Sequence, residues 1–426
     1  MIKACSSALR KMVPLWAYRL RRQIRWCTKL LLRKRQINRL RKKDKIKVLF
    51  LAFTPAMWKA DSFYRALLNH PKFEPEIFTI PHIHCTTIED RKKQLKQLRD
   101  FFDKKGYHYI EWINDEGVPK CNELPREYDI LVYPQPWVGA VPDMVDFPRH
   151  SDRWFICIAY ATHSHTTEWE YNKWYQNIAL IDCYENKITK RQSARKKYNL
   201  GLNSVITGLP IVDEFSRSDY VSPWKKQPMS VKRIIWAPHW TITDTSSLLP
   251  SYSNFLSIAE SMLNYAQANT DKIQIAFKPH PWLRKELYKH SQWGKKRTDD
   301  YYAAWESSSN TQLEQGEYVD LFMTSDAMVH DSCSFCCEYM LTGKPVLFLP
   351  RNEEAQTSIL NKMAYDIFYA QYMGTTIEDI NMFIEEKVIK GYDPMKEKRA
   401  ELVSKYLIPP HGRSAGENIV NAILGI

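Results

Sequence analysis

The chain has 426 residues and a formal net charge of +13, and 44% of its residues are hydrophobic and 26% charged. This composition is close to that of soluble globular proteins, which excludes a mainly disordered chain. No apolar run approaches the ~20 residues of a membrane-spanning helix, and the length suggests two or three domains.

The positive charge is concentrated in one segment. Residues 1–47 contain 17 Lys or Arg and one acid, whereas the other 379 residues carry 44 basic and 47 acidic side chains. A nearly neutral body argues against a nucleic-acid-binding fold with a basic stripe. Apolar residues, with Trp16 and Trp26 among them, recur through the basic segment, as in an amphipathic helix at an anionic membrane surface. We predict a membrane-associating arm over 1–45; a helix packed on the body and a nucleic-acid-binding arm are the alternatives.

After the arm, short apolar stretches alternate with helical ones. Strands are expected at 46–53, 76–80, 129–133, 154–160, 178–183 and 204–207, and helices at 57–69 and 88–104. This alternation predicts a parallel sheet with crossover helices.

Residues 208–230 interrupt the rhythm with Gly, Pro and polar residues, as an interdomain linker does. The pattern then restarts, with strands expected at 233–237, 272–277, 327–330 and 345–349 and helices at 252–268, 282–290, 334–341, 377–389, 394–407 and 414–424. The prediction is an α/β fold of two doubly wound, Rossmann-like domains, 46–215 and 231–410, followed by a C-terminal helix at 411–426. Ligands of such sheets bind at the carboxyl ends of the strands, so we expect the site in a central cleft that the two domains face.

Four polar stretches of the second half are expected in turns directly after strands. They are Ala237–Trp240, Lys278–Pro281, Ser325–Asp326 and His330–Phe335. In the last stretch, Ser332 and Ser334 are good N-cap residues, and a helix N-terminus stabilises a phosphate.

Other side chains would complete a nucleotide site there. Glu338 lies one helical turn after Ser334, where its carboxylate would accept hydrogen bonds from ribose hydroxyls. His239, Lys278 and His280, at neighbouring strand ends, would add donors to the same anion, and a phosphate favours the protonated imidazole. Each residue alone is also explained as a loop or capping residue; their combination favours a nucleotide site. No Walker A motif and no GxGxxG is present, which argues against P-loop and standard dinucleotide sites.

The stretches WAPHW, KPHPW, YVDLFMTSDAMVHDSCSFCCEYMLTGKPVLF and HGRSAGENIVNAIL resemble the CDP-glycerol glycerophosphotransferase family, whose members build teichoic acid and related surface polymers. The resemblance is good over about 180–426, weak over 46–180, and looser to other GT-B nucleotide-sugar transferases. It implies a GT-B-like fold, a nucleotide-bound donor in the C-terminal domain, a membrane-bound acceptor near the N-terminal one, and no cofactor or metal.

The same resemblance implies residue roles. Asp331, Ser332 and Ser334 match the stretch that holds the donor phosphates, although Ser332 and the following Cys replace a Tyr and a Ser of the family pattern. His280 matches the His of its Arg-Pro-His-Pro motif, with Lys278 in place of Arg. His239 falls where teichoic acid members often have Thr, which points to a capsule-type branch.

The N-terminal histidine motif of the family, Trp-His-Gly-Thr-Pro-Leu-Lys, is not intact here. The nearest candidate is Ala161–Thr166, directly after an expected strand, which contains His163 and His165 but lacks the Gly and the Lys. A histidine there would take a proton from an acceptor hydroxyl, and such general-base help is worth about 10²–10⁴-fold. We favour His163 because it is nearer the strand end; the pair as plain loop residues is the alternative.

The remaining cysteines and histidines give little indication of a metal site, a nucleophile or a disulfide. His82-Ile83-His84-Cys85 could hold two metal ligands, but no second pair lies nearby, and the cysteines of CSFCC (333–337) are better explained as helix-core residues than as ligands or nucleophiles. Nine irregularly spaced Cys, several within apolar runs, are typical of a reduced cytosolic protein without structural disulfides.

The sequence therefore predicts a transferase on the cytoplasmic face of the membrane. It would move glycerol phosphate, or a related polyol phosphate, from a CDP-activated donor to a lipid-linked polymer precursor. Residues 1–45 would bind the anionic membrane surface, and no nucleic-acid partner is expected. A GT-B glycosyltransferase that uses a UDP- or GDP-sugar is the first alternative. A non-catalytic polysaccharide- or lipid-binding protein on a transferase scaffold is the second.

Overall fold

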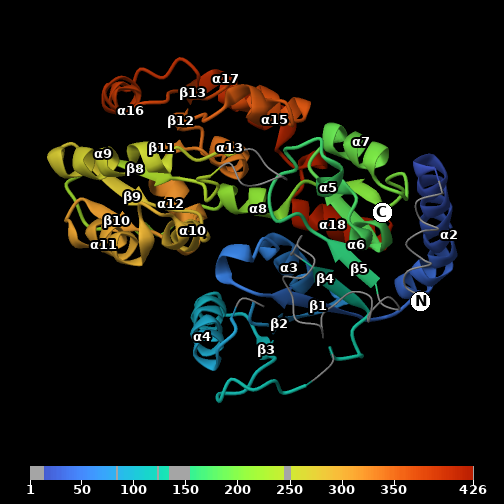
Figure 1. Ribbon diagram of the computed structural model, residues 1–426. Coiled ribbons are helices and arrows are strands. Elements are labelled where there is room, and N and C mark those ends of the chain that lie inside the picture. The colour runs from blue at the N-terminus through green and yellow to red at the C-terminus, as the bar shows by residue number, and fades with distance from the viewer. Residues whose placement is uncertain (1–13, 83–84, 122–123, 134–153, 244–250, 426) are drawn as a thin grey trace, which may run out of the picture. The chain divides into compact units, whose positions relative to one another are not determined.

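The structure is a computed structural model that describes residues 14–82, 85–121, 124–133, 154–243 and 251–425. The chain divides into two compact units, one formed by Met1–Asp213 with Pro409–Ile426 and the other by Glu214–Ile408. Each unit contains one parallel sheet flanked by helices (Figure 1). The predicted α/β fold with two doubly wound, Rossmann-like halves is confirmed.

The first unit has the strand order β3-β2-β1-β4-β5-β6-β7. Its strands are β1 Ile46–Ala52, β2 Phe73–Thr79, β3 Tyr109–Glu111, β4 Ile130–Tyr133, β5 Trp154–Cys157, β6 Ile181–Tyr184 and β7 Ser204–Ile206. Its helices are α2 Leu15–Arg41, η1 Pro55–Met57, α3 Asp61–Leu68, α4 Ile88–Lys104, α5 Glu168–Tyr171, α6 Trp174–Ile178, α7 Lys187–Lys196, α8 Pro210–Asp213, η6 Pro410–Gly412 and α18 Ala415–Leu424.

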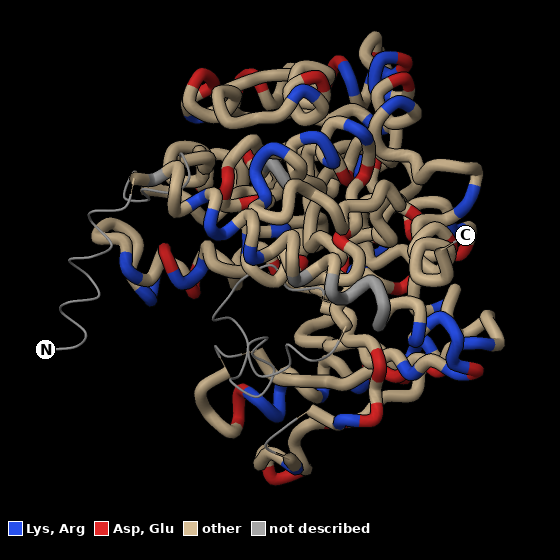
Figure 2. The backbone as a smooth tube through the Cα atoms, turned by 90° about the vertical axis from the view of Figure 1, so that its right-hand side faces the viewer, with Lys and Arg blue, Asp and Glu red and all other residues tan. Residues whose placement is uncertain are grey.

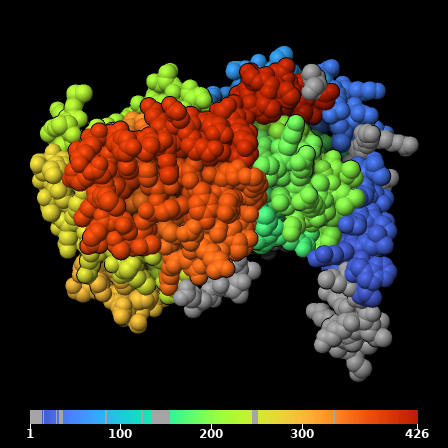
Figure 3. All heavy atoms as spheres, turned by 90° about the horizontal axis from the view of Figure 1, so that it is seen from above, coloured from blue at the N-terminus to red at the C-terminus, as the bar shows by residue number. Residues whose placement is uncertain are grey.

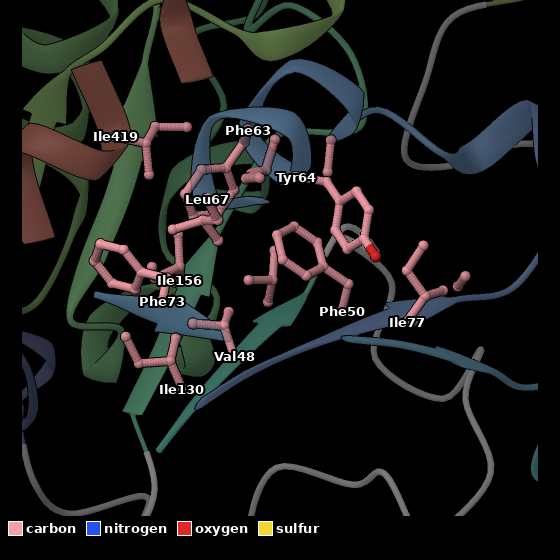
Figure 4. Packing of buried hydrophobic residues seen from close by; sticks show 14 of the residues in the cluster. Val48, Phe50, Phe63, Tyr64, Leu67, Phe73, Ile77, Ile130, Ile156 and Ile419 are labelled. Atoms are coloured by element: carbon pink, nitrogen blue, oxygen red, sulfur yellow. The ribbon is translucent and has the colours of Figure 1, made fainter. Parts of the chain in front are cut away.

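The central strand β1 is buried on both faces. Val48 and Phe50 point into one core cluster, and Leu49 and Leu51 point into the other. This double burial explains why the strand is a continuous apolar run rather than an alternating one. Figure 4 shows the α3 side chains, among them Phe63, packed over Phe50 and Val48.

The C-terminal helix α18 belongs to the first unit, although it follows the second unit in sequence. Its Ile419 is fully buried in the same core as β1 (Figure 4). The helix packs so closely on α3 that a Cβ at Gly416 would lie 2.4 Å from the carbonyl oxygen of Ser62. Asp213 ties the helix start to the last helix before the chain leaves this unit, because its carboxylate accepts hydrogen bonds from the main-chain N–H groups of Ala415 (3.0 Å) and Gly416 (3.2 Å).

The second unit has the strand order β10-β9-β8-β11-β12-β13. Its strands are β8 Lys232–Ala237, β9 Ile273–Phe277, β10 Thr311–Leu313, β11 Ala327–His330, β12 Val346–Phe348 and β13 Tyr372–Met373. Its helices are η4 Glu214–Ser216, α9 Phe255–Ala268, α10 Leu283–Lys289, α11 Gly294–Ser307, α12 Val319–Thr324, α13 Cys333–Met340, α14 Glu353–Thr357, α15 Lys362–Phe368, α16 Ile377–Phe383, the π-helix η5 Ile384–Ile389 and α17 Lys396–Tyr406.

The core of the second unit is aromatic. Trp236 of β8 is fully buried and stacks on Phe255 of α9, with ring centroids 5.7 Å apart, and on Phe277 of β9, at 5.0 Å. These large rings fix the end of β8 and β9, where the polar loops begin. Figure 3 shows the orange to red part of the chain, from β12 to α17, covering one side of this unit.

Two local predictions were wrong, and a third was right in position but not in structure. The helix expected at 57–69 begins only at Asp61, after the turn η1. The border of the two units, between Asp213 and Glu214, falls within the linker expected at 208–230, but residues 210–216 of that stretch are helical. Ser325–Asp326 does not follow a strand but precedes β11, where the Asp326 carboxylate accepts the N–H of Arg233 at 2.7 Å. That pair therefore lies at the strand starts, away from the expected site.

Within the described ranges, none of the helices combines the length and the apolar character needed to cross a bilayer. The seven cysteines that the structure describes form no disulfide.

Candidate active site

The strand order of the second unit places two loops at its topological switch point. From β8 the chain proceeds to β9 on one side, and from β11 it proceeds to β12 on the other. The loops after β8 and β11 therefore diverge and leave a crevice, which is where doubly wound sheets bind ligands. His239 lies in the first loop, and Asp331 and Ser332 lie in the second.

Asp331 holds these two loops together. One carboxylate oxygen accepts the main-chain N–H of His239, and the other accepts the Ser253 hydroxyl (3.0 Å) and the N–H of Asn254 (2.9 Å). Burial raises the pKa of Asp331 to about 7, against the lowering effect of these donors. Since both oxygens already serve the fold, Asp331 positions the site, and a direct contact with phosphate is not its main role.

His239 and His280 come from adjacent strand ends, and their ring centroids lie 5.1 Å apart. The Nδ1 atom of His280 accepts the main-chain N–H of Trp282 at 3.1 Å. The Nδ1 atom of His239 lies 2.8 Å from the hydroxyl of Thr241, whose oxygen in turn accepts the N–H of Tyr252 at 2.9 Å. Nδ1 of His239 also accepts the main-chain N–H of Thr241 at 3.4 Å. Both rings therefore use Nδ1 as an acceptor, and their neutral forms carry the proton on Nε2.

Burial favours the neutral form of both histidines, whereas the protonated form considered in the sequence analysis depends on a bound phosphate. Burial lowers the pKa of His280 to about 3, and burial together with His280 lowers the pKa of His239 well below its ordinary value. Two neutral Nε2–H donors at a switch point still suit an anion, and a bound phosphate would raise both pKa values.

Helix α13 begins beside this pair. Ser332 occupies its N-cap position, with extended backbone angles (φ −109°, ψ 127°). Ser334 lies in the first turn, and its side chain falls outside the described part of the structure. The first N–H groups of a helix stabilise negative charge, so the predicted phosphate position is retained.

Lys278 and Glu338 meet at one tyrosine. The hydroxyl of Tyr318 donates a hydrogen bond to the Glu338 carboxylate, and the Lys278 ammonium lies 5.9 Å from the centroid of the Tyr318 ring. Lys278 also donates to the carbonyl oxygen of Gly316 at 2.9 Å. Both charged side chains are buried. The structure thus brings Lys278 and Glu338 together through Tyr318, which the sequence analysis did not identify.

A second cluster lies in the first unit, after β5. The main-chain N–H of His163 donates to the Glu185 carboxylate at 2.7 Å, and its Nδ1 lies 3.0 and 3.1 Å from the two oxygens. Glu185 directly follows β6, so two neighbouring strand ends bring the pair together. Burial alone would lower the pKa of His163, but the negative charge of Glu185 outweighs burial, so the pKa of His163 is raised. Burial alone would raise the pKa of Glu185, but His163 outweighs burial, so the pKa of Glu185 is lowered.

Aromatic rings hold this imidazole in place. The ring of His163 stacks on Tyr171, with centroids 5.4 Å apart, and lies 4.6 Å from the ring of Tyr184. The hydroxyl of Tyr184 donates to Asp182 at 2.6 Å, and the fully buried ammonium of Lys197 pairs with the same carboxylate at 2.8 Å. The position of His163 is therefore supported by several buried contacts.

His165 is the less buried of the two candidate bases. Glu170 accepts the main-chain N–H groups of Ser164 (2.9 Å) and His165 (2.7 Å), and its carboxylate lies 3.4 Å from Nδ1 of His165. Two carboxylates, Glu170 and Glu185, thus fix the loop after β5. Glu185 had a weak sequence signal, since it lies two residues after the strand predicted at 178–183, whereas Glu170 had none.

The described residues contain no group of three or more His, Cys, Asp or Glu side chains that could hold a metal ion. Of the stretch considered as a metal site, His84 lies outside the described residues. Both the main-chain N–H of His82 (2.8 Å) and the Cys85 thiol (2.7 Å) contact the Gln94 side-chain oxygen.

Comparison with known proteins identifies the family of this sequence. The sequence profile described as CDP-Glycerol:Poly(glycerophosphate) glycerophosphotransferase matches residues 162–425, more than half of the chain. The comparison with curated proteins found no match.

Solved structures with the same fold include two variants of the wall teichoic acid polymerase TagF. One has a TM-score of 0.54 at 13% identity and the other 0.52 at 12%, and each match covers 95% of this chain and 98% of that one. A UDP-N-acetylglucosamine 2-epimerase has a TM-score of 0.51 at 14% identity, covering 89% and 95%. These similarities confirm the predicted GT-B-like fold.

Proposed function

Because this chain belongs to the CDP-glycerol:poly(glycerophosphate) glycerophosphotransferase family and is a transferase that uses CDP-glycerol, we propose that it adds glycerol phosphate, or a related polyol phosphate, to a membrane-linked precursor of a cell-surface polymer. The family predicted from the motifs is confirmed by the profile. The observation that carries the rest of the proposal is the pair of Nε2–H donors, His239 and His280, beside the start of α13 at the switch point.

The second unit holds the donor in this proposal. Its phosphates lie against His239, His280 and the first N–H groups of α13, with Ser332 and Ser334 at the helix start. Asp331 keeps the two loops in register, and Glu338 lies on the nucleoside side. Lys278, which meets Glu338 at Tyr318, adds a positive charge to the donor site. As the bond to the leaving phosphate breaks, charge grows on CMP, and preorganised donors stabilise that charge without reorganisation. We propose that hydrogen bonds supply this stabilisation without a metal, so EDTA would leave turnover unchanged.

The first unit activates the acceptor. Its hydroxyl oxygen attacks the glycerol-bearing phosphorus, the bond from that phosphorus to the bridging oxygen breaks, and CMP leaves with the electron pair. His163 takes the hydroxyl proton. Since Glu185 fixes Nδ1, the proton goes to Nε2. His165, the second candidate, lies 3.4 Å from Glu170 and is not enclosed by rings in the same way.

Helix α2 is the proposed membrane contact. One side of it meets the body, where Arg19 pairs with Glu168 at 3.4 Å and Arg22 lies over the ring of Tyr198 at 5.4 Å. A different side exposes a stripe of apolar residues, namely Trp16 (69% exposed), Leu20 (48%), Ile24 (60%) and Leu31 (65%). At about 100° per residue these four fall within an arc of about 80°.

Basic residues accompany this apolar stripe. Figure 2, in which α2 faces the viewer, shows blue Lys and Arg segments recurring along it, and Arg21 and Arg25 are exposed. An exposed apolar stripe beside arginines suits an anionic bilayer, to which each basic residue adds about 1 kcal/mol. We therefore propose a peripheral position on the inner face of the cell membrane.

Vesicle co-sedimentation tests the membrane proposal. Replacing Trp16, Leu20 and Ile24 by Ser should reduce binding to vesicles with anionic lipid at least about tenfold, since apolar burial in the interface is lost. Leu68→Ser, at a 50% exposed apolar residue of α3, is the matched control. Unchanged vesicle binding by the triple variant would reject the proposal, and loss of RNA binding instead would favour the nucleic-acid alternative.

A nucleotide-release assay tests the function. The purified chain is mixed with bacterial lipid extract and, in separate wells, with CDP-glycerol, CDP-ribitol, UDP-sugars and GDP-sugars. CMP release that requires the lipid supports the proposal. Release of UDP or GDP instead would assign a glycosyltransferase activity to the same fold, and no release from any donor would favour a non-catalytic binding protein.

A further inference from the structure

Two tryptophans stand at the same strand ends as the histidine pair. Trp240 directly follows His239, and Trp282 follows His280 by two residues. The two indole rings are T-shaped, with centroids 5.2 Å apart, and Trp282 is 44% exposed. A large aromatic side chain that stays this exposed beside a candidate active site is available for a ligand.

The tryptophans are coupled to the histidines. The ring of Trp240 lies 5.6 Å from that of His239 and 6.2 Å from that of His280, and the ring of Trp282 lies 6.1 Å from that of His280. The N–H of Trp282 is also the donor that fixes Nδ1 of His280. The four rings therefore form one cluster, with phosphate donors at one end and an exposed indole at the other.

A hollow lies among residues that follow the two tryptophans in sequence. It has a volume of about 410 Å³ and is lined by Ile242, Thr243, Glu286, Lys289, His290 and Ser291. Ile242 follows Trp240 by two residues, and Glu286 lies one turn after Trp282, whose carbonyl oxygen accepts its N–H at 3.1 Å. Most lining side chains carry hydroxyl, carboxylate or ammonium groups. The indole faces would pack against the C–H groups of a ligand, and the polar side chains of the hollow would bind its hydroxyls. This combination suits a ligand with many hydroxyls.

We propose that Trp240 and Trp282 bind the polyol end of the donor, with its hydroxyls directed to this hollow, and so select the group that is transferred. The inference rests on the proposed function, which sets the donor phosphates at the histidine pair. In the strand order β9-β8-β11, the start of α13 lies on the β11 side of His239, and Trp282 lies on the β9 side. The two ends of the donor leave the phosphates in opposite directions, so a nucleoside toward α13 places the polyol toward the tryptophans.

Binding of CMP and of CDP-glycerol, measured separately by calorimetry without lipid acceptor, tests this inference. Both ligands share the nucleoside and one phosphate, and CDP-glycerol adds a second phosphate and the polyol. CDP, which has both phosphates and no polyol, is the third ligand and should bind to Trp282→Ala as CMP does. Trp282→Ala should weaken CDP-glycerol binding about tenfold, equivalent to about 1.4 kcal/mol, and leave CMP binding within about twofold. Trp282→Phe, which keeps a ring, should restore part of the difference. Tyr365→Ala is the matched control, because Tyr365 is 46% exposed in the same unit and lies on α15.

Three outcomes would overturn the inference. Equal weakening of CMP and CDP-glycerol by Trp282→Ala would place the indole on the nucleoside, and unchanged binding of both would remove it from the donor site. A loss that Tyr365→Ala reproduces would be non-specific. Failure of the proposed function is a separate result, in which the unaltered chain binds neither CMP nor CDP-glycerol.

Discussion

The replacement Glu185→Gln is the sharpest test of the proposed base. The carboxylate of Glu185 receives both the main-chain N–H and the Nδ1 of His163, at 2.7 to 3.1 Å. Glutamine has nearly the same shape, and its oxygen still accepts one of these donors. Its NH₂ group, however, replaces the second oxygen and presents a donor to Nδ1, so the ring loses both its charge partner and the preference for a proton on Nδ1.

The structure sets the size of the effect. The carboxylate partners of metal-bound histidines contribute about 10–100-fold, which serves as the guide here, and complete loss of general-base help costs about 10²–10⁴-fold. We therefore expect kcat to fall about 10–100-fold in Glu185→Gln and further in His163→Ala. The pH profile should move as well, because the base works only when neutral. Glu185 raises the pKa of His163 against burial, so without its charge the acid limb of kcat/KM shifts to lower pH.

The assay is CMP release over a range of pH, with CMP affinity of the second unit as a check of integrity. Glu89→Gln, at an exposed carboxylate in the first turn of α4, is the matched control and should leave both rate and profile unchanged. If Glu185→Gln kept the full rate and the original acid limb, the assignment of His163 as the base would be refuted. If only the rate fell, Glu185 would act through structure alone.

Three further variants probe the donor site and the fold. His280→Ala should lower kcat about 10²–10³-fold, as loss of one preorganised donor does, with normal melting; full CMP release would contradict its role. Asp331→Asn should lower the melting temperature, since an unsatisfied buried donor costs about 1–3 kcal/mol, and weaken CMP binding through the loop of His239. The folded-state pKa of Asp331, about 7, lies above its unfolded value. The stability that this group gives the wild-type chain is therefore lost as the pH rises from about 4 to about 7. In calorimetric melts, the melting temperature of Asp331→Asn should depend less on pH over this range. Gly416→Ala should destabilise the first unit by about 1–3 kcal/mol, because its Cβ would meet the carbonyl of Ser62; denaturant titration of the variant with no change would disprove that close packing.

The fold was predictable where a strand was long and apolar. The run at 46–53 is buried on both faces, and its composition alone indicates β1. The strands β3, β10 and β13 have two or three residues each and were not predicted. So short a stretch has no measurable periodicity, and it becomes a strand because it pairs with a longer neighbour such as β9 or β12.

The proposed donor site could be located in the sequence because its candidate residues follow strands directly. His239, His280 and Ser332 each occupy a turn after a parallel strand, and such turns share one edge of a sheet. Their partners were not predictable in the same way. Thr241 fixes the tautomer of His239 through a bond to Tyr252, 11 residues away, and Glu185 meets His163 across 22 residues. Contacts of this kind depend on strand order, which cannot be deduced from a single sequence.

Strand order also places two histidines in opposite environments, which suit different proposed roles. His163 lies beside a carboxylate, which raises its pKa and prepares it to accept a proton. His280 lies among rings and main-chain groups, and burial keeps it neutral with a pKa of about 3. A neutral ring still donates its Nε2–H to a phosphate, and a bound phosphate then raises its pKa. Environments that push like groups apart identify acid and base partners, so the contrast between His163 and His280 is itself an argument for a proton acceptor in the first unit and hydrogen-bond donors in the second.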